Sequence, residues 1–304
     1  MTIGIAAFGT HAGAAVYDAV LATELLGRGA ITGFAVFAVL DASGFLHYRV
    51  TQRGGVTSLD IPAEWKNMQV AALISSGPDR PVPLTQFLAG AEGRGLVSGH
   101  RLPNQAGKDG TPLNEAALSR MISGEHPQSA VDAVLQAHPE WDAGLVAIDT
   151  QGRLGMGNSA RVTRRDDLGA FRRETPVASL GLLHNSIYAR SGMTDDVGEL
   201  AWARLQGRAG GWCFISLNRT VPLTMAELDC VHIDEDGAIV ALDIANPRVM
   251  TLERPGAAAY LGAEVRRLGE PVGKVITELY VPIRGGCAQP SDTPIQNNLL
   301  AKLY

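Results

Sequence analysis

The chemistry suggested by this sequence begins at Thr2, which opens the apolar segment "TIGIAAF". Methionine aminopeptidase usually removes Met1 before a residue as small as threonine. Thr2 would then carry a hydroxyl and a free α-amine on one residue at the start of a strand. A hydroxyl that uses its own amine as a base can attack an amide carbonyl. Thr2 is therefore our candidate nucleophile.

Two Gly- or Ser-containing segments gather polar side chains that could hold a substrate. They are "GHRLPN" (99–104), with His100, Arg101 and Asn104, and "LLHNSIYARSG" (182–192), with His184 and Asn185. Loops at strand ends commonly carry binding residues. Two such histidines could orient a carbonyl and move a proton. The alternative is that each histidine caps a turn or lies on the surface.

The segment "GTHAG" (9–13) joins the first strand to a helix and contains Thr10 and His11. Backbone N–H groups at a helix N-terminus can hold an anion, so this turn is a candidate oxyanion site together with Asn158. The alternative is a plain helix cap formed by Thr10.

A strand–turn–strand pattern occurs three times, with Asp, two residues and Gly at the turn. The pairs are Asp41 and Gly44 in 34–46, Asp149 and Gly152 in 142–161, and Asp234 and Gly237 in 228–242. Aspartate can bond the backbone ahead of it and glycine accepts positive φ. Ala-rich helices are predicted over 11–29 and 195–211, and two more within 111–141. Strands that are apolar on both faces need cover on both sides. The sequence therefore predicts a layered α/β (α+β) fold with hairpin-connected, partly antiparallel sheets.

The segments "AGAAVYDAVLATELLGRG" and "DAGLVAIDTQGRLGMGNSAR" resemble the N-terminal helix and the catalytic strand of a known family. The resemblance, over residues 11–165, is to the plant-type asparaginases and isoaspartyl peptidases and to the γ-glutamyltransferases. These are N-terminal-nucleophile hydrolases. The resemblance implies an αββα sandwich in which a Thr, Ser or Cys attacks an amide with its own amine as base.

One departure matters, because Asp142 stands where that family has its nucleophilic Thr. A carboxylate cannot be released by self-cleavage, which needs a hydroxyl or a thiol. The resemblance still implies that Asn158 and Ser159 line a pocket. It places the family's arginine and aspartate substrate clamp near Arg161 to Asp166.

The composition limits the class of protein. The 304 residues carry a net charge of −5 and are 46% hydrophobic and 19% charged, which favours a folded protein and disfavours a nucleic-acid partner. We expect a single large domain, 1–304, with a softer boundary near 190–195 between a core (1–192) and a C-terminal part (193–304). The three cysteines fit a reducing compartment, and no secretory signal or membrane span is evident, so we expect a cytoplasmic protein without a membrane partner. The tail "TPIQNNLLAKLY" is expected to be a helix that packs on the domain or on a second subunit of a homo-oligomer.

We expect no cofactor and no metal site. None of the histidines forms H-x-H or H-E-x-x-H, and His232, which shares a strand face with Asp234, fits a half-buried core residue better than a ligand. Cys213 and Cys230 lie in apolar strands, and Cys287 in a loop is the more reactive candidate.

Three hypotheses remain open at this point. The first is an amide-bond hydrolase, acting on C–N bonds other than standard peptide bonds, for a small carboxylated or cyclic amide. The second is a non-catalytic protein of the same fold that binds a small ligand or a partner. The third is an amidohydrolase that uses His184 or Cys287.

Overall fold

The computed structural model describes residues 1–27, 31–189 and 191–304, which form two compact units, Met1–Gly210 and Gly211–Tyr304. From the sequence we expect one domain with a softer boundary near 190–195. The boundary between the two units instead follows Gly210, because helix α5 (Met193–Leu205) packs against α1 (Ala12–Leu26) and against strands of the first unit. Residues 193–210 therefore belong to the first unit.

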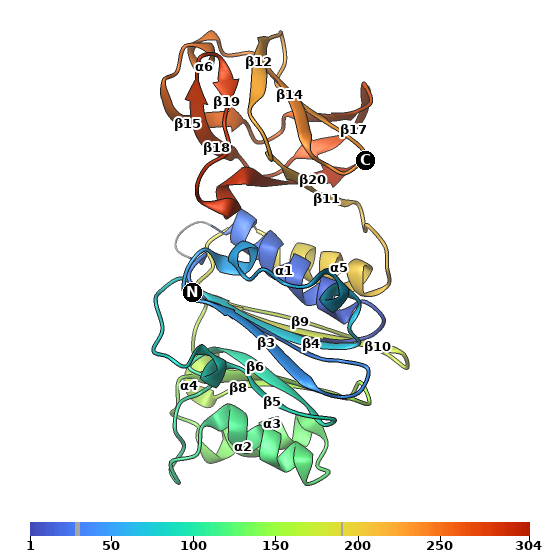
Figure 1. Cartoon of the computed structure of the whole chain (residues 1–304). Coiled ribbons are helices and arrows are strands. Elements are labelled where there is room, and N and C mark those ends of the chain that lie inside the picture. The colour runs from blue at the N-terminus through green and yellow to red at the C-terminus, as the bar shows by residue number, and fades with distance from the viewer. Residues whose placement is uncertain (28–30, 190) are drawn as a thin grey trace. The chain divides into compact units, whose positions relative to one another are not determined.

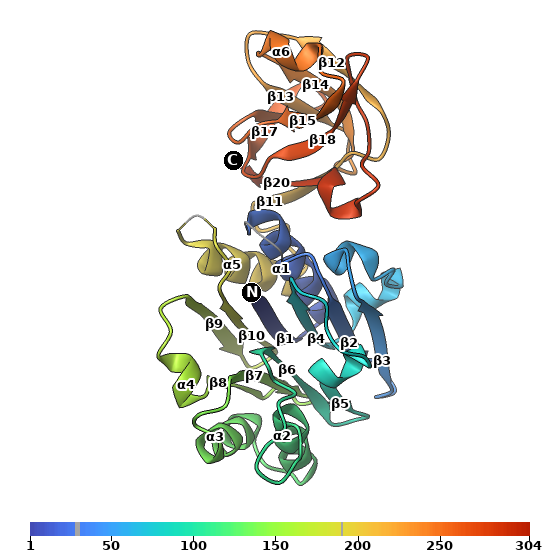
Figure 2. The same cartoon turned by 90° about the vertical axis from the view of Figure 1, so that its left-hand side faces the viewer.

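The first unit has four layers in the order αββα, which confirms the predicted class (Figure 1). Helices α1 and α5 cover the outer face of a six-stranded sheet of order β3-β2-β4-β1-β10-β9 (Figure 2). Helices α2 and α3 cover the outer face of a four-stranded sheet of order β5-β6-β7-β8. All neighbouring strands in both sheets are antiparallel.

The strands of the first unit are β1 (Thr2–Phe8), β2 (Ala35–Leu40), β3 (Leu46–Thr51), β4 (Val70–Ser76), β5 (Ala89–Ala91), β6 (Gly95–Arg101), β7 (Ala143–Asp149), β8 (Leu154–Asn158), β9 (Leu168–Thr175) and β10 (Ala178–Asn185). The other helices are α2 (Leu113–Ile122), α3 (Pro127–Ala137), the short α4 (Ala160–Thr163), and 3-10 turns at Gly55–Ser58, Ala63–Asn67 and Leu84–Phe87. The helices predicted in 11–29, 111–141 and 195–211 are thereby confirmed for the described residues, while positions 28 and 29 of the first lie outside them.

Small side chains let the layers of the first unit approach closely. The alanines of α1 that face the sheet, such as Ala15 and Ala19, are fully buried. At Gly4, on β1, a Cβ atom would lie 2.0 Å from the backbone oxygen of Gly99, on β6. The two sheets are therefore in backbone contact here, and the end of β6 is held beside the beginning of β1.

The three Asp-x-x-Gly turns share one hydrogen-bond pattern. In each turn, one oxygen of the Asp side chain accepts from the backbone N–H groups two and four residues ahead. The glycines Gly44, Gly152 and Gly237 have φ of 83°, 78° and 84°, which is why glycine is needed. The predicted turn chemistry is therefore confirmed at all three places.

The second unit is built on a ten-stranded sheet of order β11-β20-β17-β16-β13-β14-β12-β19-β18-β15. Its strands are β11 (Trp212–Ser216), β12 (Val221–Met225), β13 (Cys230–Ile233), β14 (Ile239–Ile244), β15 (Arg254–Ala259), β16 (Glu264–Arg267), β17 (Glu270–Val275), β18 (Leu279–Arg284), β19 (Cys287–Ala288) and β20 (Asn298–Leu303), with α6 (Pro247–Met250) and a 3-10 turn at Pro294–Asn297.

The predicted C-terminal helix is wrong, because residues 298–303 of that segment form β20 and only the short 3-10 turn at Pro294–Asn297 precedes it. This strand pairs antiparallel with β11 on one side and with β17 on the other. The pairing buries Leu299, Leu300 and Ala301. Burial in the sheet thus overrides the helical preference of a short Leu- and Ala-containing segment. In the described part of the chain, no helix is long and apolar enough to cross a membrane.

Glu24, near the end of α1, is a buried carboxyl group with two hydrogen-bond donors. It accepts from the Ser75 hydroxyl at 2.8 Å and from the Val56 backbone N–H at 3.1 Å. Burial raises the pKa of Glu24 from 4.5 to about 8, so the folded state binds its proton more tightly than the unfolded state does. This contribution to stability is complete below the unfolded pKa and is lost as the pH rises toward 8. The slope is about 1.4 kcal/mol per pH unit at most.

We therefore expect Glu24→Gln to flatten the loss of stability with rising pH. Glutamine keeps an oxygen that can accept from Ser75 and Val56, but it has no charge to bury. Urea unfolding measured at several pH values through this window tests the expectation. A wild-type slope that persists in the variant would contradict it, and Glu64→Gln, at an exposed position, is the matched control.

Candidate active site

Thr2 lies at the start of β1, in the interior of the six-stranded sheet and next to the N-terminus marked in Figure 2. It is directly opposite Ser76 of β4 and Asn185 of β10. Residues directly opposite each other place their side chains on the same face. On these strands that face turns toward the second sheet, because Ala6, Ile74 and Leu183 have the same parity and contribute to the core between the sheets. The Thr2 hydroxyl donates to Ser76 Oγ at 3.2 Å, and Thr2 is 2% exposed.

The second sheet contributes His100, on β6, and Asn158, on β8. His100 Nδ1 lies 3.1 Å from Asn185 Oδ1, and its Nε2 lies 2.6 Å from Asn158 Oδ1. A Cβ atom on Gly144, between them on β7, would lie 2.3 Å from His100 Nε2 and 2.2 Å from Asn158 Oδ1. Only glycine leaves room for this contact. The apolar space between the sheets thus ends in a polar cluster next to Thr2.

His100 holds two amide side chains in place. It is fully buried, and burial lowers its pKa below 6.5, so the ring is neutral at neutral pH. A neutral imidazole donates through only one nitrogen. The Asn185 amide nitrogen donates to Ser186 Oγ at 2.9 Å, so the Asn185 oxygen faces His100 Nδ1. His100 Nε2 lies against Asn158 Oδ1. A neutral ring donates to one of these two amide oxygens. With both nitrogens engaged, His100 is a positioning residue and not a free base.

A small pocket of about 210 Å³ opens at Thr2 and is lined by Met1, Thr2, Arg80, Arg101, Leu102 and Asp142. Arg101 and Asp142 form a two-pronged ion pair, with Arg101 Nε 2.9 Å from Asp142 Oδ1. Arg101 has a φ of 64°, an uncommon conformation for a residue with a side chain. Such strained residues tend to occur at functional sites, where neighbouring contacts hold them.

Arg80 brings an unbalanced positive charge to this pocket. Its Nη2 donates to Ser76 Oγ at 3.2 Å, and its buried Nε has no hydrogen-bond partner. No carboxylate of the described residues forms an ion pair with Arg80. Burial and the nearby Arg101 guanidinium both lower its pKa. An arginine side chain nevertheless keeps its charge in a protein. The pocket therefore favours an anion.

The N-terminal amine at this pocket is easier to deprotonate than usual. Burial is the largest cause that lowers the pKa of the Met1 amine below 8.0, and the charges of Arg101 and Arg80 lower it further. Ser76 Oγ donates to the Met1 carbonyl at 2.7 Å. Met1 thus occupies part of the pocket beside the Thr2 hydroxyl.

A further group supports Asn185 from outside the pocket. Ser186 Oγ donates to Asp167 at 2.6 Å, and Arg165 forms an ion pair with the same carboxylate. The hydrogen bond from Arg165 lowers the pKa of Asp167 to about 2, so it stays charged. Ser186, with a φ of 53°, is a second strained residue next to the polar cluster. Of the segment Arg161 to Asp166, where the resemblance implies a substrate clamp, Arg165 is paired with Asp167, one residue beyond its end.

The structure brings five of the residues predicted from sequence to this end of the sheets: Thr2, His100, Arg101, Asn158 and Asn185. The strands β6 and β10 extend to Arg101 and Asn185, so these residues and the histidines lie at strand ends and not in loops.

Other predicted site residues lie elsewhere. His184 points to the side of β10 opposite to that of its neighbour Asn185. It faces α5, where its Nε2 lies 2.7 Å from Thr194 Oγ1. Burial lowers the pKa of His184 to about 4. Ser159 caps α4, accepting from Val162 N and donating to the Trp141 carbonyl.

Asn104 and Arg161 are also outside the pocket. Asn104 donates to Gln86 Oε1 at 2.8 Å, and Arg161 is exposed, although its charge acts on Asp142.

The expected oxyanion site at Gly9–His11 requires correction. Thr10 and His11 follow the last residue of β1, whereas Thr2 is its first. A strand of this length separates its ends by about 20 Å. His11 Nδ1 is bound to Asn67 Oδ1 at 3.0 Å, and Thr10 is exposed. The turn therefore cannot donate to an oxyanion formed at Thr2.

Sequence reasoning missed Ser76, Arg80 and the role of Asp142. The segment "ISSGPDR" (74–80), which contains the end of β4, does show a strand that ends in hydroxyl groups and is followed by charged residues. Its proximity to Thr2 follows from the pairing of β4 with β1, which is a non-local contact and has no signal in one sequence.

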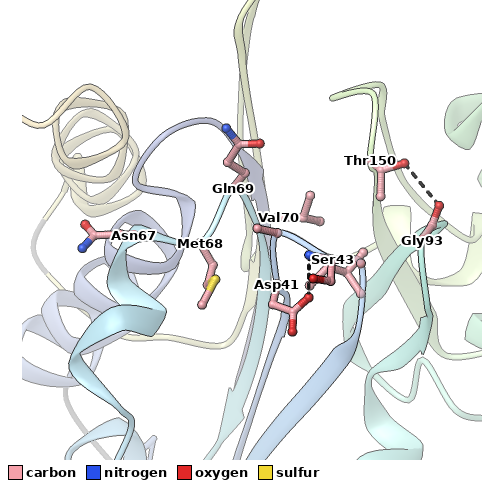
Figure 3. Close-up of a pocket in the computed structure, with 11 residues that line it drawn as sticks. Asp41, Ser43, Asn67, Met68, Gln69, Val70, Gly93 and Thr150 are labelled. Atoms are coloured by element: carbon pink, nitrogen blue, oxygen red, sulfur yellow. Dashed lines mark hydrogen bonds between the residues drawn. The ribbon is translucent and has the colours of Figure 1, made fainter.

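A larger cavity lies at the other end of β1, where Val70, which pairs with Phe8, lines it (Figure 3). Its volume is about 590 Å³, and Asp41, Ser43, Asn67, Gln69 and Thr150 contribute its polar groups. Asp41 is already bonded to Ser43 and to His47, and Thr150 to Gly93. The smaller pocket at Thr2 is the better candidate for chemistry, because it holds a hydroxyl beside an unpaired arginine.

Comparisons with known proteins identify families but no activity. The family model "Domain of unknown function (DUF6963)" matches residues 2–211, and "Domain of unknown function (DUF7259)" matches residues 220–295. No curated protein matches the chain. Among solved structures, glutamine phosphoribosylpyrophosphate (PRPP) amidotransferase from B. subtilis, complexed with ADP and GMP, is similar at 9% identity with a TM-score of 0.35. The match covers 60% of this chain and only 41% of that one, and a score this low does not establish a shared fold. Because the first family model spans more than half of the sequence, the chain belongs to the DUF6963 family.

Proposed function

We propose that this protein hydrolyses the amide bond of a small anionic substrate, with Thr2 as an N-terminal nucleophile. The observation that carries the proposal is the position of the Thr2 hydroxyl. It lies at the start of an interior strand, hydrogen-bonded to Ser76, in a pocket that also holds the unpaired charge of Arg80. The chemistry needs a hydroxyl and an amine on one residue at such a place.

The proposed reaction begins after cleavage of the peptide bond that precedes Thr2. The freed amine accepts the proton of Oγ, and Oγ attacks the amide carbonyl to form a tetrahedral oxyanion. The side-chain amide N–H of Asn158 is the candidate donor to this oxyanion. The intermediate collapses to an ester on Thr2, and the ammonium gives its proton to the leaving amine. Water, activated by the same α-amine, then hydrolyses the ester and releases the acid.

The electrostatics support the base in this scheme. The Thr2 amine would lie deeper than that of Met1 and in the field of the same two arginines, both of which lower the pKa of the Met1 amine. A base must be neutral to accept a proton. Activity should therefore be present above the amine pKa and be lost as the pH falls through it, and a pH–rate profile measures this midpoint.

The substrate class follows from Arg80. We expect Arg80→Gln to raise KM for an anionic amide by about tenfold or more, because an ion pair in a partly dehydrated pocket contributes more than an exposed one. At a pH above the pKa of the amine, kcat should change little. The KM for a neutral amide of the same size should also change little, so the variant should lose its preference for the anion. Steady-state kinetics on both substrates test this. The matched control is Arg53→Gln, since Arg53 is exposed and already paired with Asp79. Equal KM changes for both substrates would contradict the assignment.

Intact-mass measurement with N-terminal sequencing tests the first step. We expect the purified protein to begin at Thr2. A protein that retains Met1 in full occupancy would rule out the mechanism, because the amine would be absent and the pocket partly filled. That result would favour the non-catalytic, ligand-binding hypothesis.

The third hypothesis, a loop His or Cys site, gains no support from the geometry. His184 is buried against α5 with one ring nitrogen on Thr194. Cys287 lies on β19 in the second unit, and the two residues belong to different compact units.

A further inference from the structure

The second unit holds a mixed group of metal-binding side chains on one face of its sheet. Cys230 and His232 lie two residues apart on β13, and Asp243 is directly opposite Cys230 on β14. One ligand atom from each lies within 4.8 Å of the other two. Their neighbours Val231, Ile233 and Leu242 point the other way and belong to the apolar core of the unit. The three side chains therefore project from the opposite, outer face.

The local backbone favours convergence of these side chains. The pairing of β13 with β14 shifts register between His232 and Ile233, and such bulges often re-aim a side chain beside a site. His232 lies opposite Ala241, whose small side chain leaves room for the imidazole. His232 Nε2 already contacts Asp243 Oδ2 at 2.7 Å.

Two carboxylates flank Cys230. Asp243 lies on one side of this thiol and Glu264, opposite it on β16, lies on the other. Arg266 offsets them in part, but it is exposed and pairs with Glu264 at 2.6 Å. A divalent cation among the three ligands would reverse the sign of this field and bind the thiolate.

We infer that Cys230, His232 and Asp243 form a Zn²⁺ site with three protein ligands and an open fourth position. One thiolate, one imidazole and one carboxylate form a set that suits Zn²⁺ in tetrahedral geometry. Zinc bonds of about 2.0–2.3 Å place ligand atoms roughly 3.3–3.8 Å apart, which needs only small side-chain shifts here. His232 and Asp243 each have 27% of their side chain exposed, so an ion can enter. The site is independent of the chemistry proposed at Thr2.

Cobalt titration of the full-length protein, stripped of metal with a chelator, tests the site. We expect a thiolate-to-Co²⁺ charge-transfer band in the near ultraviolet that saturates at one equivalent and is removed by Zn²⁺. Cys230→Ser should abolish the band. Cys287→Ser, which removes a half-buried thiol elsewhere in the same unit, should leave it unchanged. The band reports a thiolate ligand and does not depend on any enzymatic activity.

Two further variants keep the test decisive if Cys230→Ser does not fold. His232→Asn and Asp243→Asn change half-exposed positions, and each should weaken Co²⁺ binding by at least about tenfold. Absence of the band in the wild-type protein would overturn the inference. So would a band that survives Cys230→Ser, or Co²⁺ affinity unchanged by both asparagine variants.

Discussion

Replacing Thr2 with alanine is expected to abolish amide hydrolysis and leave the fold intact. The substitution removes the only atom in the proposed mechanism that bonds to the substrate carbonyl, so kcat should fall by at least about 10³-fold. Stability should change by only about 1 kcal/mol, because the hydroxyl makes one hydrogen bond, to Ser76 at 3.2 Å. Alanine is also small enough for removal of Met1, so the N-terminus would be processed in the same way.

Two companion variants make this experiment specific. Thr2→Ser keeps a hydroxyl and an amine and should retain measurable turnover. Thr150→Ala removes a threonine hydroxyl in the large cavity at the other end of the sheets and should behave as wild type. Activity retained by Thr2→Ala, with unfolding curves that match the wild type, would remove Thr2 from the mechanism. Loss of activity in Thr150→Ala but not in Thr2→Ala would indicate that the active site is in the large cavity.

A chain extended ahead of Thr2 is expected to be inactive until the extension is cut immediately before Thr2. In the extended chain the Thr2 nitrogen is part of a peptide bond and cannot accept a proton. The added residues would also fill the pocket of about 210 Å³ in which Met1 lies, held by Ser76. Cleavage should therefore restore activity from background to the wild-type level.

The matched control for the extended chain is a second cleavage site that leaves one glycine before Thr2. This product differs by a single residue and should remain inactive, because its amine is displaced from the hydroxyl. Equal activity of the two cleaved products would show that the amine of Thr2 is not the base. Assays before and after cleavage on the same preparation remove differences in expression.

Local signals in the sequence were sufficient for much of the fold. The Asp-x-x-Gly turns could be predicted because the aspartate bonds only to backbone groups two and four residues ahead. The second helix of the pair in 111–141 could be predicted because Pro127 occupies its first turn, where a missing N–H costs nothing. In contrast, β20 was expected to be a helix, and only its partners β11 and β17 make it a strand.

The candidate site was predictable in part for the same reason. Thr2 could be singled out from its own chemistry, without knowledge of its neighbours. Ser76 and Arg80 could not, because they reach Thr2 through sheet order, which joins residues more than seventy positions apart. The separation of Thr10 and His11 from Thr2 was predictable from the sequence. These residues stand at opposite ends of one strand, and two ends of one strand cannot share a small site. His184 does not reach the site because successive residues of a strand face opposite sides. Its neighbour Asn185 is on the side that faces the second sheet.

The backbone contact between Gly4 and Gly99 has a consequence for large-scale mutagenesis of this chain. Any side chain at Gly4 would have to displace the backbone oxygen of Gly99 and so wedge the two sheets apart beside Thr2. A scan of all single substitutions scored by activity would therefore rank Gly4 with the nucleophile, although glycine has no reactive group. A parallel scan scored by protein abundance would distinguish Gly4 from Thr2. Gly4 variants would score low in both scans, whereas Thr2 variants would score low only in the activity scan.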